Sequence, residues 1–425
     1  MCHGGPGCVT SRHGRAGHGC DREVHPSGLL DAPPKSPVAS AARDPGTKPG
    51  GRARRGRDRV RRSFGFAVVV LLLASHADAI PRYAARYRQS CNLCHHDPSG
   101  GGLRSLYASQ FIVPSEMAFR ASTEEQLKRI RPDISESVTI GADVRTLHVY
   151  ADEENLYNFF QMQGEIYAAF QADDRWSAVV NLDETASYEI FALGYVLPWS
   201  GYVKVGRFVP LHGWKFDDHN YFVREELGFD QPRNTDAGVE VGFMPANTML
   251  VVSAGNGNAG NTTFDNNKDL AFGVTALRRF HVGPAGIALG VSYRRNRGGT
   301  GNANETQFGG PHGYVQWSRF AWLWEVDGTR FGPITPGNDL DGLVTTHEVS
   351  WTLRRGVDLV GSYNFVDPNI DEKTGARTRL GIGVDVIATP FVNVQVRANN
   401  FQFEPGADVS GRNHWRSEVQ LHLFY

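Results

Sequence analysis

The sequence has few cysteines, no long apolar run and no excess of charge of one sign, and each absence excludes a class of protein. Five cysteines in 425 residues are too few for a disulfide scaffold. The 44 basic and 45 acidic residues leave no basic excess, which argues against a nucleic-acid partner. No run reaches the roughly 18 apolar residues that a membrane-spanning helix needs. A helical membrane protein is therefore excluded.

The first 79 residues differ in composition from the rest of the chain. They hold 13 basic residues, six acidic residues and three of the five cysteines. Three arginines within residues 59–62 precede an apolar run over 64–74, and small residues at 77–79 mark a cleavage position. This three-part pattern predicts a secretory signal peptide over residues 60–79. Residues 1–59 have no periodic pattern, so we expect a disordered extension or a start codon assigned too early.

The two remaining cysteines form the sequence Cys91-Asn92-Leu93-Cys94-His95, which is the C-x-x-C-H signature of haem c attachment. In this signature two thiols add to the haem vinyl groups, and the following imidazole coordinates the iron. A redox dithiol would be expected within a βαβ pattern, which is absent here. A zinc site would need a second ligand pair, and no other cysteine remains. The motif predicts one haem c, attached through Cys91 and Cys94 with His95 as axial ligand.

The segment around the motif, residues 80–135, is predicted to be a short helical haem c segment. Glycines at 100–102 permit close approach of the backbone to a flat ligand. A helix is predicted from Ser122, with Glu125 completing a capping box, to about Ile130. Such a short segment buries too little apolar surface to be stable alone, so we expect it to pack against another part of the chain.

The sixth ligand of the haem iron is a separate question. Met117 is the only methionine in the segment and lies beyond the glycine-rich turn, where a thioether opposite His95 is plausible. Methionine in a short apolar stretch also serves as packing. The alternatives to Met117 are therefore a water molecule, an open position or a residue of the β-strand region that follows.

From residue 136 onward the hydrophobic pattern has a period of two, in segments of about ten residues separated by Gly, Asn, Asp and Pro. Over Trp415–Tyr425, for example, the odd-numbered residues, which are apolar except Ser417, share one face, and Arg416, Glu418, Gln420 and His422 share the other. The predicted strands, sixteen in number, are 137–149, 157–170, 175–184, 187–196, 200–208, 236–244, 247–254, 270–281, 285–294, 311–319, 320–328, 343–352, 356–365, 377–387, 391–401 and 415–425.

Both a soluble β-sandwich and a transmembrane barrel produce such alternation. A sandwich seldom needs sixteen strands of this length, whereas a barrel has apolar outward faces, polar inward faces and aromatic girdles near its strand ends. Candidate girdle residues are Tyr150, Tyr195, Trp199, Trp351, Trp415 and Tyr425. The predicted fold is therefore all-β: an antiparallel transmembrane β-barrel of about 16 strands over residues 136–425, in the bacterial outer membrane, with residues 80–135 as its plug.

The stretch 206–229 is too long and too rich in charged residues for a hairpin turn. It predicts a loop that folds inward as a constriction or covers the barrel mouth. Asp217, Asp218 and His219 have side chains that suit ferrous iron. Mixed charge more often marks a salt-bridged loop, so these three residues are not predicted as ligands.

The order of signal peptide, Cys91–His95 motif and about sixteen porin-like strands resembles the fused cytochrome-porin family of outer-membrane iron oxidases. The resemblance implies a single haem c in or at the mouth of the barrel. It also implies electron transfer between an extracellular donor or acceptor, such as ferrous iron, and periplasmic carriers, in contact with outer-membrane lipid. The continuation Pro98–Arg104 departs from the iron-oxidising members, so the donor stays open. A solute porin with a structural or sensory haem, or a haem enzyme such as a peroxidase, are the alternatives.

Overall fold

The computed structural model describes residues 81–87, 89–151, 156–184, 188–216, 218, 220–229, 235–257, 268–298, 304–333, 339–407 and 412–425. The predicted extension over 1–59 and the predicted signal peptide over 60–79 lie outside the described residues. All described residues belong to one compact unit. No helix among them is long and apolar enough to cross a membrane.

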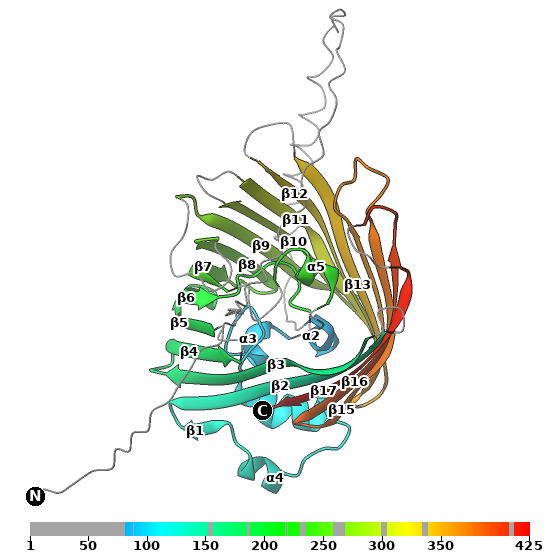
Figure 1. The fold of residues 1–425 in the computed structure, drawn as a ribbon. Coiled ribbons are helices and arrows are strands. Elements are labelled where there is room, and N and C mark those ends of the chain that lie inside the picture. The colour runs from blue at the N-terminus through cyan, green and yellow to red at the C-terminus, as the bar shows by residue number, and fades with distance from the viewer. Residues whose placement is uncertain are drawn as a thin grey trace, which may run out of the picture. The chain divides into compact units, whose positions relative to one another are not determined.

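Sixteen antiparallel strands form one closed barrel (Figure 1). Each strand pairs with its neighbours in the sequence, β17 pairs with β2, and the pairing of β9 with β10 completes the ring. The barrel strands are β2 (Val138–Ala151), β3 (Leu156–Gln171), β4 (Trp176–Asp183), β5 (Tyr188–Leu197), β6 (Gly201–Phe208), β7 (Asp236–Phe243), β8 (Thr248–Gly255), β9 (Ala271–Val282), β10 (Ala285–Gly298), β11 (Asn304–Trp317), β12 (Phe320–Pro333), β13 (Leu340–Arg354), β14 (Val357–Asp367), β15 (Arg377–Thr389), β16 (Val392–Phe403) and β17 (His414–Phe424). The all-β fold and the predicted number of barrel strands are confirmed.

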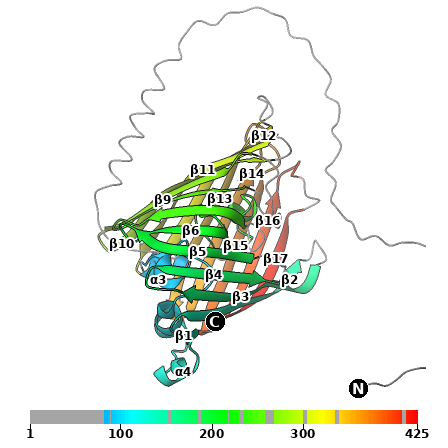
Figure 2. The same cartoon turned by 90° about the vertical axis from the view of Figure 1, so that its left-hand side faces the viewer.

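The helices lie before the barrel strands or in one long connection between them. They are α2 (Pro81–Tyr87), α3 (Cys91–Cys94), the π-helix η1 (Ala108–Met117), α4 (Glu124–Arg129) and α5 (Phe222–Glu225). Helices α2, α3 and α5 lie within the ring of strands (Figure 1). Helix α4 and the short strand β1 (Asp133–Ser135), which pairs only with β2, project from one end of the barrel (Figure 2).

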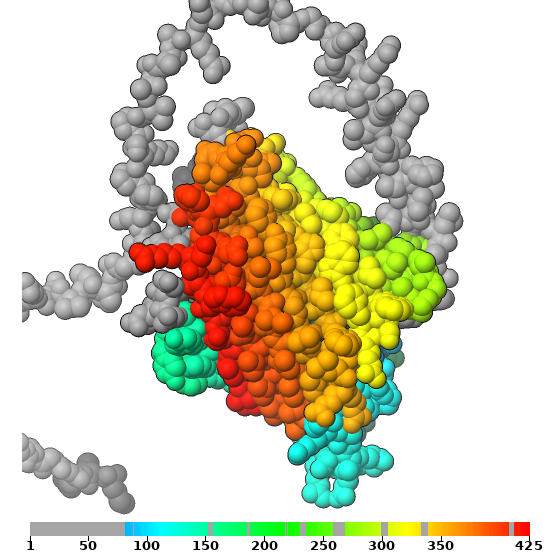
Figure 3. Space-filling view, turned by 90° about the vertical axis from the view of Figure 1, so that its right-hand side faces the viewer, coloured from blue at the N-terminus to red at the C-terminus, as the bar shows by residue number. Residues whose placement is uncertain are grey.

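The wall has an apolar outside and a polar inside. On β17, Trp415 is 61% exposed and Leu421 is 43% exposed, whereas the alternate residues Glu418 and Gln420 are only 5% and 7% exposed. Strands β12 to β17 form a continuous outer surface (Figure 3, yellow to red). A closed barrel pairs its backbone groups around the ring, so this surface can face lipid without an open sheet edge. The predicted alternation is confirmed.

One predicted girdle residue is wrongly placed. Tyr195 shares the face of Phe191 and Leu193 on β5, and it packs inward against Tyr202 with ring centroids 6.2 Å apart. Side chains alternate along a strand, so an odd-numbered residue here points to the lumen. Trp199, Trp351 and the other outward aromatics remain on the surface.

Two predicted boundaries also need correction. The capping box of α4 uses Thr123 and Gln126 rather than Ser122 and Glu125, because the extended backbone of Thr123 aims its hydroxyl at the Gln126 N–H. Strand β11 begins at Asn304, seven residues before the prediction. Its polar start pairs with β10, where Arg295 and Arg297 form salt bridges with Glu305. A polar extension of this kind carries no alternating apolar signal.

Candidate functional site

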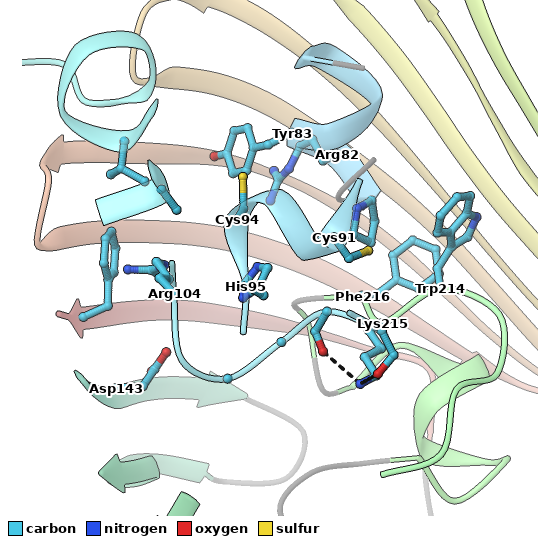
Figure 4. A pocket seen from close by; sticks show the side chains of 18 of the residues that line it. Arg82, Tyr83, Cys91, Cys94, His95, Arg104, Asp143, Trp214, Lys215 and Phe216 are labelled. Atoms are coloured by element: carbon cyan, nitrogen blue, oxygen red, sulfur yellow. Dashed lines mark hydrogen bonds between the residues drawn. The ribbon is translucent and has the colours of Figure 1, made fainter. Parts of the chain in front are cut away.

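The predicted haem-attachment motif lies inside the barrel. Cys91, Cys94 and His95 line a cavity of about 240 Å³. Strands from opposite parts of the ring contribute to its walls, including β3 through Tyr167 and β9 through Leu277. Figure 4 shows the motif facing this space, with Trp214 and Lys215 approaching from the connection between β6 and β7. The cavity thus combines the N-terminal segment with the barrel wall.

A single helical turn and a tight hairpin fix the motif. The N–H of His95 donates to the carbonyl of Cys91 at 2.9 Å, which closes the turn of α3. His95 then forms an isolated antiparallel bridge with Arg104, and Ser105 N–H donates to Cys94 O at 2.9 Å. The chain therefore leaves α3 and returns beside it within ten residues.

The return depends on three consecutive glycines. Gly100, Gly101 and Gly102 have φ values of +87°, +85° and +62°, which side-chain-bearing residues rarely adopt. A Cβ atom on Gly100 would lie 3.3 Å from Cys91 Sγ. The glycines predicted to allow close approach thus bring the backbone against the first thiol of the motif.

The ionisation states of the motif fit metal ligation better than thiol redox chemistry. Burial, followed by the positive charge of Arg104, lowers the pKa of His95 to about 4. The imidazole is therefore neutral at pH 7, which is the form that binds a metal. Burial raises the pKa of Cys91, and it raises that of Cys94 to about 11. A dithiol catalyst requires a lowered thiol pKa, which these residues lack.

An ion-pair network ties the hairpin to the wall and to the connecting loop. Lys204, which is fully buried on β6, lies 3.1 Å from Asp97 Oδ1 and 2.8 Å from Glu240 Oε1. Lys215 Nζ donates to the Gly100 carbonyl at 2.8 Å and to Ser99 Oγ at 3.0 Å. Burial raises the pKa of Asp97, but Lys204 and Lys215 together hold it well below its usual range. The hairpin is thus held by charges whose partners lie far away in the sequence.

Helix α2 is fixed to the opposite wall in the same way. Arg82 forms salt bridges with Glu348 on β13 and Asp385 on β15. Arg86 forms another with Asp358 on β14, at 2.6 Å. These contacts hold α2 beside the motif, where Arg82 and Tyr83 line the cavity.

Met117, the predicted sixth ligand, lies within the barrel and packs in an apolar cluster with Ile112 and Phe424. It is 7% exposed at the end of η1 and lines the same cavity as His95. The structure also brings two residues to this cavity that the sequence reasoning did not identify, Met249 on β8 and His422 on β17. His422 Nε2 lies 2.8 Å from Asp143. No sequence signal separated Met249 or His422 from ordinary strand residues, because only ring closure brings these strands near the motif.

The cavity lining suits an anionic cofactor. Six basic side chains line it, against two acidic ones: Arg82, Arg104, Arg145, Lys215, Arg224 and Arg279, with Asp143 and Glu348. Arg279 is 4% exposed, and its Nε atom has no hydrogen-bond partner among the described residues. His95 Nδ1 is likewise buried without such a partner. Haem carries two propionates, so this lining and the motif fit the predicted group.

The long connection between β6 and β7 folds into the lumen. This inner loop spans residues 209–235 and is described at 209–216, 218, 220–229 and 235. Trp214 N–H donates to Glu325 Oε2 at 2.7 Å, and its indole N–H donates to the Gly313 carbonyl. Asp218 pairs with Arg379 at 3.0 Å. Asp217 and His219 lie outside the described residues, and Asp218 has the salt-bridged role favoured above.

Comparisons with known proteins bear on the barrel. No family profile and no curated protein matches the chain. The fold is similar to that of OmpT from the outer membrane of Vibrio cholerae, with a TM-score of 0.52, 11% identity and coverage of 69% of this chain and 100% of that one. An anion-selective porin from Comamonas acidovorans matches with a TM-score of 0.50 and 10% identity, over 68% of this chain and 99% of that one. OprB of Pseudomonas putida matches with a TM-score of 0.50 and 10% identity, over 68% of this chain and 94% of that one.

The chain has the fold of an outer-membrane porin. Sequence identities near 10% show a shared fold and nothing more. The predicted location in the bacterial outer membrane agrees with this fold. A shared fold does not test the haem motif, so the cofactor, the electron transfer and the electron-carrier partners stay predictions.

Proposed function

We propose that the chain is an outer-membrane electron-transfer protein in which one haem c is attached inside a porin-like barrel. The observation that carries the proposal is the position of Cys91, Cys94 and His95, which line one cavity within the ring of strands. A lipid bilayer insulates, so a redox group inside a transmembrane barrel offers electrons a route between the two sides.

The chain's own residues have distinct roles in this proposal. Cys91 and Cys94 would hold the cofactor, and neutral His95 would ligate its iron. Met117 is the proposed sixth ligand, with Met249 as the competing thioether. Arg279 and Lys215 would form ion pairs with the negatively charged propionates. When bound, the haem supplies reversible one-electron chemistry.

The first experiment tests attachment. The full chain is purified from outer membranes of a host that matures c-type cytochromes, and its pyridine haemochrome spectrum is recorded. We expect one thioether-linked haem for each chain, which stays with the polypeptide on a denaturing gel. Replacing both Cys91→Ala and Cys94→Ala removes it, whereas Cys20→Ala, in the predicted leader, leaves it unchanged. A colourless wild-type chain contradicts the proposal.

A solute porin with a structural haem is the second candidate, because solved porins share the fold. The two functions differ in what the lumen must conduct. Inside this barrel, α2 and the inner loop pack against the wall through buried residues, which narrows any path for solutes. A solute porin predicts large single-channel conductance in planar bilayers that does not change in His95→Ala, whereas an electron conduit predicts low conductance.

A further inference from the structure

A group of metal-ligating side chains lies inside the barrel apart from the haem motif. His212 of the inner loop and Glu325 and Asp327 of β12 place one ligand atom each within 4.8 Å of one another. All three residues are buried. Glu325 and Asp327 are two residues apart on one strand, so both carboxylates point into the lumen.

Hydrogen bonds inside this group leave several ligand atoms unused. His212 Nε2 lies 3.1 Å from Asp327 Oδ1. His212 Nδ1 and Asp327 Oδ2 are buried and have no hydrogen-bond partner among the described residues. Two ligand atoms on one tetrahedral zinc ion lie about 3.3 Å apart, given bonds near 2.0 Å. The imidazole and the carboxylate are therefore close enough to bind one ion, which would replace their present hydrogen bond.

A second histidine stands beside the group. His312 on β11 is the cross-strand partner of Glu325 and is 1% exposed. Its Nδ1 atom also has no hydrogen-bond partner in the part of the chain that the structure describes. Its ring packs edge-to-face on Trp214 at 5.2 Å, which fixes its position. A buried imidazole without a polar partner is costly, so this second histidine also indicates that the polar groups in this part of the lumen lack a ligand.

There is room for an ion at the same place. A small cavity of about 10 Å³ is lined by His212 and Glu325, which is space for one water-sized species. Lys215 and Arg224 also line this cavity, and the guanidinium of Arg224 donates to the carbonyls of Phe216 and Phe229.

We propose that His212, Glu325 and Asp327 bind one divalent first-row transition-metal ion that clamps the inner loop to the barrel wall. The mixture of imidazole and carboxylate suits such ions better than calcium or magnesium, which prefer oxygen alone. His212 comes from the loop and the other ligands from the wall, so the ion links two elements more than 100 residues apart in the sequence. This inference does not depend on the haem.

The test uses Zn²⁺ as the probe, because it does not replace the iron of haem. The full chain in detergent is stripped with a chelator and titrated with Zn²⁺ by calorimetry. We expect one site, and at least a 100-fold loss of affinity in Asp327→Asn and in His212→Gln. The matched controls are Glu418→Gln and His414→Gln, which change buried polar residues of β17 and keep the affinity. Heat-dependent mobility on a denaturing gel shows whether each variant has folded.

A measurement on the wild type keeps the proposal falsifiable if the variants misfold. X-ray absorption at the zinc edge is expected to show only nitrogen and oxygen ligands, with imidazole scattering and bonds near about 2.0 Å. Sulfur ligands would place the zinc at Cys91 and Cys94 and overturn the proposal. Failure of the wild type to bind Zn²⁺, or equal binding by wild type and Asp327→Asn, would also overturn it.

Discussion

At the scale of single residues, the site depends on where side chains are missing as much as on where they are present. Gly100 lies against Cys91 Sγ with a positive φ, so both its conformation and its lack of Cβ are needed there. Gly228 in the inner loop also has a positive φ, +73°, but no atom lies within 4 Å of the Cβ it would gain. Substitutions at these two glycines therefore separate the cost of backbone strain from the cost of crowding.

We expect Gly228→Ala to lower the free energy of unfolding by about 1 kcal/mol, which is the cost of a left-handed conformation for alanine. Gly100→Ala should lower it further, because the new methyl group also presses on the first thiol of the motif. Urea unfolding of the two variants measures the difference. Equal losses would show that crowding at Cys91 is unimportant.

The sixth ligand of the haem iron also depends on one side chain. If Met117 ligates the iron, Met117→Leu should abolish the thioether-to-iron charge-transfer absorption and lower the reduction potential by roughly 0.1 V or more. Met249→Leu is the matched control, because Met249 lines the same cavity from β8. Visible spectra and potentiometric titration measure both effects. If only Met249→Leu abolishes the absorption and lowers the reduction potential, the sixth ligand comes from the barrel wall.

At the scale of elements, buried ion pairs fix the N-terminal helices and the hairpin inside the barrel. Asp97 holds two lysines from two different elements, Lys204 of β6 and Lys215 of the inner loop. The lumenal face of a porin-like barrel is polar, so an inserted segment finds charged partners rather than an apolar core. Removing one partner leaves buried charge without compensation.

We therefore expect Asp97→Asn to lower the free energy of unfolding by about 3 kcal/mol at pH 7. The matched control is Asp133→Asn, which breaks a salt bridge to Arg131 outside the barrel and should cause no measurable change. Urea midpoints of the two variants provide the comparison. A shift in Asp133→Asn as large as that in Asp97→Asn would refute the argument from burial.

The same carboxylate predicts a pH dependence. Its pKa in the folded chain lies below the ordinary aspartate value of 3.8, so its charge stabilises the fold fully above that value. As the pH falls below 3.8, the unfolded chain binds the proton first and the stabilisation is lost. The difference in stability between wild type and Asp97→Asn should accordingly shrink between pH 5 and about pH 2. A constant difference across this range would contradict the assigned ion pairs.

At the scale of the whole molecule, the barrel and its contents have separate tasks. The wall presents apolar side chains to lipid, while the lumen holds the motif, the inner loop and their charged partners. The proposed conduit requires that electrons cross without a wide aqueous channel. A filled lumen and a transmembrane wall provide that combination.

We expect proteoliposomes that contain the full chain to transfer electrons from an external reductant to an enclosed acceptor, at a rate at least tenfold above that of protein-free vesicles. The variant with both Cys91→Ala and Cys94→Ala should fall to the protein-free rate, with its barrel still folded. The readout is the absorbance of the enclosed acceptor. Equal rates with and without the two cysteines would remove the conduit function.

The sequence alone determined the strands and the motif, because both depend on local spacing. A period of two between Trp415 and Tyr425 defines a two-faced strand wherever it lies, and C-x-x-C-H is contained in five residues. Boundaries such as the start of β11 were less accurate, because polar strand extensions do not alternate.

Only the tertiary structure decided what faces the motif inside the barrel. Ring closure brings Lys204, Met249, Arg279 and His422 around a segment more than 100 residues earlier, and it places His212 beside Asp327. A single strand looks the same in the sequence whichever strands surround it. The physical reason is that hydrogen bonding between neighbouring strands fixes the ring, and the ring then determines which inward side chains meet across the lumen.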